Sequence, residues 1–315
     1  GFGGATLDVA RYMLSLPDVG IFHANSNNLT GLLPLDVSSL RFLYELDLSN
    51  NHFAGAFPAG VLSAGRLTFL DLRYNSFSGP IPPQLFDLRL EVLFLNHNRF
   101  SQEIPSNLGR SVALYISFAD NAFTGEIPRS IGRCSNLREV LFLNNALGGC
   151  LPYEVGLLGN AAVFDAGSNR IRGPIPQSFG CLAKMQRLNL ARNELYGAVP
   201  EAVCMLPSLR NLSLSYNYFT QVGPRCRRLI AAAVMDVKMN CILDLPGQRS
   251  REECAAFFRT RKVCPSAKSF DIVPCKVPPA AAVSGGSSGA SRARGGSGAP
   301  SPTYNALRRN THYHA

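Results

Sequence analysis

Nine cysteines are the residues of this chain with the clearest capacity for chemistry, because thiolates bind metals, act as nucleophiles and form disulfides. They stand at positions 134, 150, 181, 204, 226, 241, 254, 264 and 275. No two of them have C-x-x-C spacing and no His is interleaved, so a zinc site is disfavoured. Five cysteines crowd between 226 and 275, which predicts a disulfide framework in an oxidising compartment.

Catalytic and cofactor sites need a convergent set of polar groups, and the sequence offers none. It contains no nucleophile motif, no phosphate-binding loop and no paired carboxylates outside its repeats. His312 and His314 near the C-terminus would make only a weak metal site. We therefore expect no enzyme activity, no cofactor and no metal.

The net charge of +10 is unevenly distributed along the 315 residues. Residues 1–224 hold 16 basic and 16 acidic residues, whereas residues 225–315 hold 15 basic and five acidic ones. The basic end could contact an acidic polysaccharide, although a solvated tail is the simpler interpretation. We expect no nucleic-acid partner and no membrane span, since no apolar stretch is long enough.

A repeat of 23 or 24 residues organises the body of the chain, as in "LDLSNNHFAGAFP" and "LDLRYNSFSGPIP". Its Asn recurs at positions 27, 51, 75, 98, 121, 145, 169, 193 and 217. This pattern resembles the leucine-rich repeat of the plant extracellular subtype. The resemblance implies an α/β solenoid of about nine to ten coils with a curved parallel sheet on its concave face. Each Asn amide can satisfy turn backbone, and the recurring Gly can take turn dihedrals.

Because successive residues of a strand point to opposite faces, the strand residues that precede each repeating Asn alternate between the core and the concave face. In "EVLFLNN", Val140 and Phe142 take inward positions, so Leu141 and Leu143 are expected on the solvated concave face. Acidic and aromatic residues of neighbouring coils share that face, which suits a basic ligand with apolar anchors. The predicted binding residues are Glu45, Asp47, Phe69, Asp71, Phe94, Tyr115, Asp120, Glu139, Leu141, Leu143 and Asp165.

After the ninth coil, "SREECAAFF" carries a capping-box signal, with Ser250 three residues before Glu253. It predicts a short helix with Cys254, Phe257 and Phe258 on its packed side, within a disulfide-stapled end cap. Cys204 is expected to pair with Cys226, and the remaining four candidates, Cys241, Cys254, Cys264 and Cys275, among themselves in an open order. Buried thiols account for most of Cys134, Cys150 and Cys181, and the odd number of cysteines leaves room for a bond between chains.

The repeats joined to "NCILDLPGQRSREECAAFFRTRKVCP" resemble the leucine-rich-repeat extensins of the plant cell wall, including their pollen-expressed branch. The resemblance implies a secreted wall protein that can dimerise and whose repeats bind small basic cysteine-rich signalling peptides, the rapid alkalinization factors. Family members continue into a Ser- and Pro-rich extensin region, of which only Ser301-Pro302 and Tyr304 are reminiscent here.

Three segments follow from these patterns: a solenoid at 1–224, a Cys-rich cap at 225–276 and a Gly/Ser/Ala/Pro tail at 277–315. Two sequons, at Asn28 and Asn211, predict glycosylation in a secreted protein. The opening "GFGGATLDV", without Met, indicates a mature or truncated fragment. Two other functions stay open, a polygalacturonase-inhibitor-like protein and a structural wall scaffold without a soluble ligand.

Overall fold

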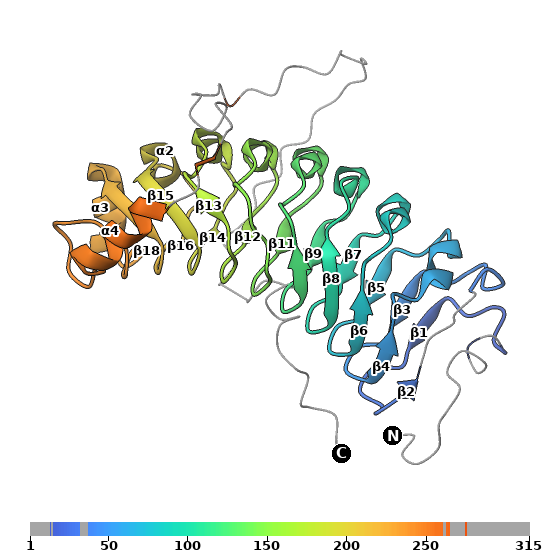
Figure 1. The fold of residues 1–315 in the computed structure, drawn as a ribbon. Helices are drawn as coiled ribbons and strands as arrows, with labels where there is room; N and C mark the ends of the chain where they lie inside the picture. Colours follow the sequence, from blue (N-terminus) through green and yellow to red (C-terminus); the bar gives the residue numbers. More distant parts are fainter. Residues whose placement is uncertain (1–12, 14, 32–36, 261–262, 265–274, 276–315) are drawn as a thin grey trace, which may run out of the picture.

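The structure is a computed structural model that describes Met13 and residues 15–31, 37–260, 263–264 and 275. Its coils follow one another in a curved row, from the blue N-terminal coils to the orange C-terminal end (Figure 1). Each coil contributes one strand to the same parallel sheet, which forms the concave face. The leucine-rich-repeat solenoid predicted from the sequence is therefore confirmed, while the predicted tail at 277–315 lies outside the described residues.

The concave sheet has ten parallel strands in the order β1-β3-β5-β7-β9-β11-β12-β14-β16-β18. Most are three residues long, because the strand must end where the next turn of the coil begins. Their bounds are Ile21–His23 (β1), Glu45–Asp47 (β3), Phe69–Asp71 (β5), Val92–Phe94 (β7), Tyr115–Ser117 (β9), Glu139–Leu141 (β11), Val163–Asp165 (β12), Arg187–Asn189 (β14), Asn211–Ser213 (β16) and Met235–Asp236 (β18).

A second set of parallel strands follows the turn in most coils and forms the lateral face of the solenoid. These strands form a five-stranded sheet, β10-β8-β6-β4-β2, and a separate three-stranded sheet, β13-β15-β17. Their bounds are Thr30–Gly31 (β2), His52–Gly55 (β4), Ser76–Gly79 (β6), Arg99–Glu103 (β8), Ala122–Thr124 (β10), Arg172–Gly173 (β13), Glu194–Val199 (β15) and Tyr218–Val222 (β17).

Short helical turns return the chain to the next strand, and most of them start directly after a Pro that ends the lateral strand. Six are 3-10 turns: Ala59–Ser63 (η1), Pro83–Asp87 (η2), Leu108–Arg110 (η3), Arg129–Arg133 (η4), Tyr153–Leu157 (η5) and Gln177–Cys181 (η6). Among the described residues, two α-helices, Glu201–Cys204 (α2) and Pro224–Ala231 (α3), do the same, and a third, Arg251–Thr260 (α4), follows the last strand.

One continuous apolar core runs through the stack, built by residues at the same position of successive coils. Phe53, Phe77, Phe100 and Phe123 stack with ring centroids 6.1–6.3 Å apart. Each ring is almost completely buried. Because a single coil cannot bury such a ring alone, the stacking of neighbours is what makes the core.

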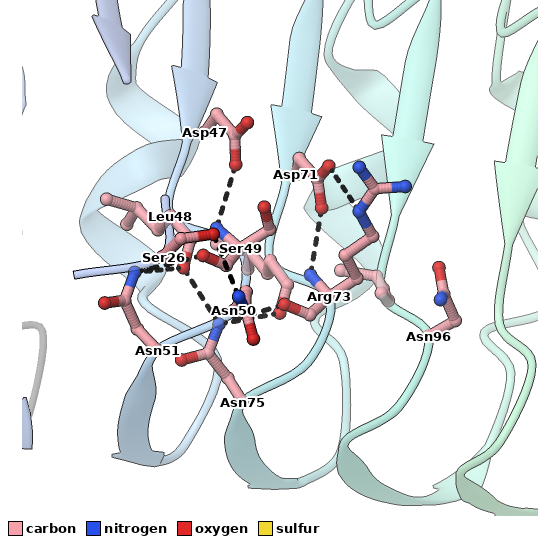
Figure 2. Close-up of polar contacts among 12 residues, drawn as sticks. Ser26, Asp47, Leu48, Ser49, Asn50, Asn51, Asp71, Arg73, Asn75 and Asn96 are labelled. Atoms are coloured by element: carbon pink, nitrogen blue, oxygen red, sulfur yellow. Dashed lines mark hydrogen bonds and ion pairs between the residues drawn. The ribbon is translucent and has the colours of Figure 1, made fainter. Parts of the chain in front are cut away.

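The repeating Asn side chains form a ladder of hydrogen bonds, as the sequence predicts. Asn51 accepts hydrogen bonds from the N–H of Asn27 and of Leu29, and its amide donates to the carbonyl of Ala24. Figure 2 shows Asn51 and Asn75 at equivalent places in consecutive coils. The same contacts recur at Asn240, whose Oδ1 accepts from Phe219 N–H at 3.0 Å. The stack therefore includes β18, beyond residue 224, and the period does not stop after the ninth coil.

The residue before each Asn of this ladder has a positive φ in ten successive coils, between 53° and 59°. These are Ser26, Asn50, Tyr74, His97, Asp120, Asn144, Ser168, Arg192, Tyr216 and Met239. Bulky residues such as Tyr74 and Arg192 are strained in this region, so the packed stack must enforce the turn. The predicted glycines, Gly55 and Gly79 among them, also have positive φ in the following turn.

The C-terminal end is closed by α4 and four disulfides. The predicted capping box is confirmed, since Ser250 N–H donates to Glu253 and Glu253 N–H donates to Ser250 Oγ at 3.1 Å. Phe257 stacks on Tyr218 with centroids 3.5 Å apart, so the expected helix face packs on the last lateral strands.

The disulfide pairing corrects part of the sequence prediction. Cys204–Cys226 and Cys241–Cys254 are bonded, the first as predicted. Cys264 and Cys275 bond Cys150 and Cys181 instead of each other, so the latter two are not buried thiols. The reason is tertiary: Cys264 and Cys275 follow α4 in the sequence but lie against the coils that contain Cys150 and Cys181, and spacing in the sequence does not reveal this. Cys134 is the free and buried thiol among the described cysteines.

Candidate functional site

Two rows of side chains point from the concave sheet, one from the first and one from the third residue of each strand. The parallel register aligns Glu45 with Phe69, Phe69 with Val92, and Val92 with Tyr115 in the first row. The same register aligns Asp47 with Asp71 and Asp71 with Phe94 in the second row. Nine of the eleven predicted residues therefore lie in these two rows, whereas Asp120 and Leu143 lie in the turns after β9 and β11.

Acidic residues of the second row are hydrogen-bonded to backbone at the strand ends. Asp47 Oδ1 accepts from Ser49 N–H at 2.9 Å, and Asp71 Oδ1 accepts from Arg73 N–H at 3.0 Å (Figure 2). Asp165 Oδ1 accepts from Gly167 N–H at 2.9 Å in the same way. A short acidic side chain here satisfies a backbone donor two residues on, so its role is structural.

Asp71 and Phe94, both predicted to be accessible, are buried. Asp71 is 1% and Phe94 6% exposed, because Arg73 covers both of them. Arg73 Nε lies 3.0 Å from Asp71 Oδ2, and its guanidinium lies 5.5 Å from the centre of the Phe94 ring. Burial raises the pKa of Asp71 to about 8, a shift that the charge of Arg73 opposes and that of Asp47 reinforces.

Leu141 is also buried, against the expectation that it lies in solvent. It is 0% exposed and packs with Ala119 and Val163 in a small second cluster, with Leu143 partly buried against it. Glu139 and Asp165, at 7% and 1%, are covered as well. The alternation of a strand gives the direction of a side chain, but its exposure depends on the neighbours about 4.8 Å away on both sides. Strand β11 is thus buried on both faces.

Six predicted residues remain partly exposed: Glu45, Asp47, Phe69, Tyr115, Asp120 and Leu143. Glu45 lies 3.1 Å from the His23 ring, and Asp120 contacts His97 at 3.3 Å. The Tyr74 ring stacks on His97 at 4.1 Å beside them. This acidic and aromatic surface covers coils near the N-terminal end, and we call it the acidic half of the concave face.

Residues that sequence counting missed make the other half of the face basic. Arg138 and Lys184 line a groove of about 480 Å³ together with Tyr115, Glu139, Asn160 and Gln186. Lys184 Nζ donates to Asn160 Oδ1 at 2.7 Å. Arg187 and Arg210 are exposed beside them. Arg138 and Arg210 immediately precede a strand, so counting only outward strand residues overlooks them.

Both predicted glycosylation sites are sterically open. Asn28 is exposed, with Oδ1 2.7 Å from the His52 ring, and Asn211 is exposed in β16. A glycan on Asn211 would lie on the concave face beside Arg187, its register partner. Glycosylation stays a prediction for both.

Within the described residues, no helix has the length and apolar character needed to cross a bilayer, and no group of three or more potential ligands is placed to hold a metal ion. The four disulfides indicate an extracellular or secreted protein.

Comparison with known proteins supports the fold. The family model described as Leucine Rich Repeat matches residues 66–88 and 89–111. No curated protein matches the chain. Among solved structures, that of a TDR receptor is 36% identical, with a TM-score of 0.68, over 72% of this chain and 40% of that chain.

Two further similar structures come from Arabidopsis. The ectodomain of the receptor kinase GASSHO1/SCHENGEN3 from Arabidopsis thaliana, in complex with CASPARIAN STRIP INTEGRITY FACTOR 2, is 31% identical, with a TM-score of 0.63, over 73% of this chain and 27% of that chain. The Arabidopsis receptor kinase HAESA, in complex with the peptide hormone IDA and the co-receptor SERK1, is 29% identical, with a TM-score of 0.65, over 70% and 38%. The chain spans less than half of each of these relatives. It carries leucine-rich repeats, and its structural neighbours include plant leucine-rich-repeat receptor ectodomains.

Proposed function

We propose that this chain is an extracellular, non-enzymatic module that binds a small basic cysteine-rich peptide of the rapid alkalinization factor type on the acidic half of its concave face. In this role it acts in the cell wall and contributes to wall integrity and growth. The structure of HAESA contains a peptide hormone, which supports a peptide as the class of ligand. The observation that carries the proposal is the row formed by Glu45, Phe69 and Tyr115.

The charge and shape of this row suit a basic peptide. Glu45 and Asp120 retain partly exposed carboxylates, and Glu91 is exposed directly before β7. Partly exposed Phe69 and Tyr115 offer rings that a ligand would desolvate, and such aromatic anchors commonly supply most of an interface's affinity. Acidic groups around them steer a basic ligand and select against an acidic one. Arg187 and Arg210 repel the same peptide from the other half.

Calorimetry with a folded, disulfide-bonded basic peptide tests the proposal. We expect Glu45→Lys and Tyr115→Ala each to weaken the Kd by about tenfold or more, since one charge reversal or one lost aromatic anchor costs at least about 1.4 kcal/mol. Asp47 and Asp71 are unsuitable for this test, because their side chains also bond backbone N–H groups.

Arg187→Glu is the matched control, because it reverses one charge on the same sheet in the basic half. It should preserve or tighten binding of the basic peptide. If Glu45→Lys, Tyr115→Ala and Arg187→Glu weaken peptide binding equally, the peptide does not bind on the acidic half. A folded wild type that binds no such peptide would leave the structural wall scaffold as the better account.

A further inference from the structure

Two of the carboxylates on the acidic half of the concave face each contact a histidine ring. His23 Nε2 lies 3.1 Å from Glu45 Oε2, and His97 Nε2 lies 3.3 Å from Asp120 Oδ2. In both pairs one coil supplies the ring and the next coil supplies the carboxylate. The negative charge of each carboxylate is therefore opposed whenever its histidine partner is protonated.

Solvent and a ligand can reach both pairs. The side chains of His23 and Glu45 are 47% and 33% exposed, and those of His97 and Asp120 are 30% and 22% exposed. An ion pair with this exposure is weak, because water screens the charges and two side chains must be ordered. A basic side chain of a peptide can therefore take the place of the ring beside either carboxylate.

The charged groups that face His23 are acidic. Its ring contacts Glu45, and the register of β1 with β3 places Asp47 beside it. Asp71 follows Asp47 in the same row, but it is buried, and burial raises its pKa to about 8. Because a carboxyl group is mostly protonated one pH unit below its pKa, Asp71 adds little charge at about pH 7. Among the described residues β1 is the edge strand of the sheet, so no further strand of that sheet faces His23.

His97 lies between the turns that follow β5 and β9. The Tyr74 ring stacks on it with centroids 4.1 Å apart, and Asp120 contacts it from the other coil. Arg73, which precedes Tyr74, is paired with Asp71 at 3.0 Å (Figure 2), so its charge is already opposed. Among these side-chain types only histidine ordinarily changes its charge between about pH 5 and pH 8.

We propose that the His23–Glu45 and His97–Asp120 pairs make the acidic half bind a basic peptide more tightly as the pH rises from about 5.5 to about 7. This inference rests on the proposed function of that surface. At the acidic end of the range the protonated rings oppose the two carboxylates and repel Lys and Arg of the peptide. At the upper end the rings are neutral, and the carboxylates are available to the peptide. By linkage, peptide binding within the range releases protons, because the peptide favours the neutral rings.

Calorimetry of the full chain at different pH values tests the proposal. The probe is the folded, disulfide-bonded basic peptide with an acetylated N-terminus and with Asn in place of each His, so that its own charge is nearly constant. We expect the Kd to be about tenfold lower at about pH 7 than at about pH 5.5, about threefold from each pair. At an intermediate pH the heat of binding should vary with the ionisation enthalpy of the buffer, since protons are released.

His23→Gln combined with His97→Asn removes both titrating rings. Gln keeps an amide donor for Glu45, and Asn suits the positive φ of 54° at position 97. This double variant should bind at about pH 5.5 nearly as tightly as the wild type binds at about pH 7. His52→Gln is the matched control, because the exposed His52 ring belongs to lateral strand β4 and contacts Asn28 Oδ1 instead of a carboxylate. The control should keep the pH dependence of the wild type.

A Kd that is the same at both pH values would overturn the proposal, and so would a pH dependence that the double variant retains. His312 and His314 lie outside the described residues and are present in every variant, so a retained dependence would be assigned to groups other than the two pairs. Binding that does not vary with pH would contradict only this inference. Absence of binding at both pH values would overturn the proposed function together with it.

Discussion

The middle of the solenoid and its C-terminal end are stabilised by different kinds of interaction. In the middle, each coil is satisfied by Asn amides and stacked Phe rings of the next coil, as at Asn145 and Phe142. At the end, Cys204–Cys226, Cys241–Cys254 and the Phe257–Tyr218 stack hold the last coils, and Cys264 and Cys275 are bonded back to Cys150 and Cys181. An inner coil has two neighbours and the last has one, so covalent closure replaces the missing coil.

Removing a long disulfide should have the largest effect on the stability of the C-terminal end. Cys150→Ser with Cys264→Ser deletes a cross-link of 114 residues and should cost about 4–5 kcal/mol in the chain-entropy model, because long loops gain most from closure. Removing Cys241–Cys254, 13 residues apart, should cost about 3 kcal/mol. Hydrogen exchange should show faster opening of α4 than of β11 in the first variant. A slower or equal rate in α4 would mean that the Cys241–Cys254 bond and the aromatic stack are enough to hold the end.

Asp71 makes the stability of the stacked coils depend on pH, because its carboxyl group is buried. Its raised pKa means that the folded state holds a proton that the unfolded state releases, so stability present at low pH is lost as pH rises from about 4 to about 8. The slope contributed by this group is at most about 1.4 kcal/mol per pH unit. Asp71→Asn keeps the acceptor for Arg73 N–H but cannot titrate. The free energy of unfolding, measured by urea at a series of pH values, should therefore fall less steeply between about pH 4 and pH 8 than in the wild type. If the free energy of unfolding changes with pH equally in both proteins, the raised pKa of Asp71 is contradicted.

Asn145→Ala examines one step of the ladder. Asn145 Oδ1 accepts from Phe123 N–H at 3.0 Å, and its amide donates to the carbonyls of Phe118 and Phe142. Losing these contacts should cost about 2–3 kcal/mol, since partly buried backbone groups are left unpaired. The midpoint of urea unfolding measures the loss. Exposed Asn136→Ala is the control, since its amide donates one long hydrogen bond to Val112 O at 3.4 Å, and it should cost well under half as much.

The smallest effect is expected at Cys134. Burial raises the pKa of its thiol to about 11, and its Sγ lies 3.4 Å from Leu108 O. The native protein should therefore resist thiol reagents at pH 8, whereas the denatured protein should react with one equivalent. Rapid labelling of the native chain would show that η4 opens readily.

The sequence was sufficient for everything that repeats. The Asn period, the positive-φ glycines and the capping box at Ser250 each depend on nearby residues, and the structure reproduces them. Cys150 and Cys181 were misassigned because their partners lie 114 and 94 residues away, and no local pattern reports such a contact.

The binding surface was predicted only in part. The direction of Leu141 followed from strand geometry, but its burial depends on Ala119 and Val163 in other coils. The basic half was missed because Arg138 and Arg210 precede their strands. Exposure on a curved sheet is a property of three adjacent coils together, and one coil's sequence does not contain it.

The Asn ladder also gives the molecule a direction of assembly during synthesis. Asn51 satisfies groups of the coil before it, through Ala24, Asn27 and Leu29, so each coil is completed only when the following one has been made. A chain emerging from the ribosome therefore carries one open coil at its growing end. In the finished protein the final coil has no successor. Its backbone groups are instead satisfied by Gln248, which accepts from Asn240 N–H, and by Arg249, which donates to Asn217 O.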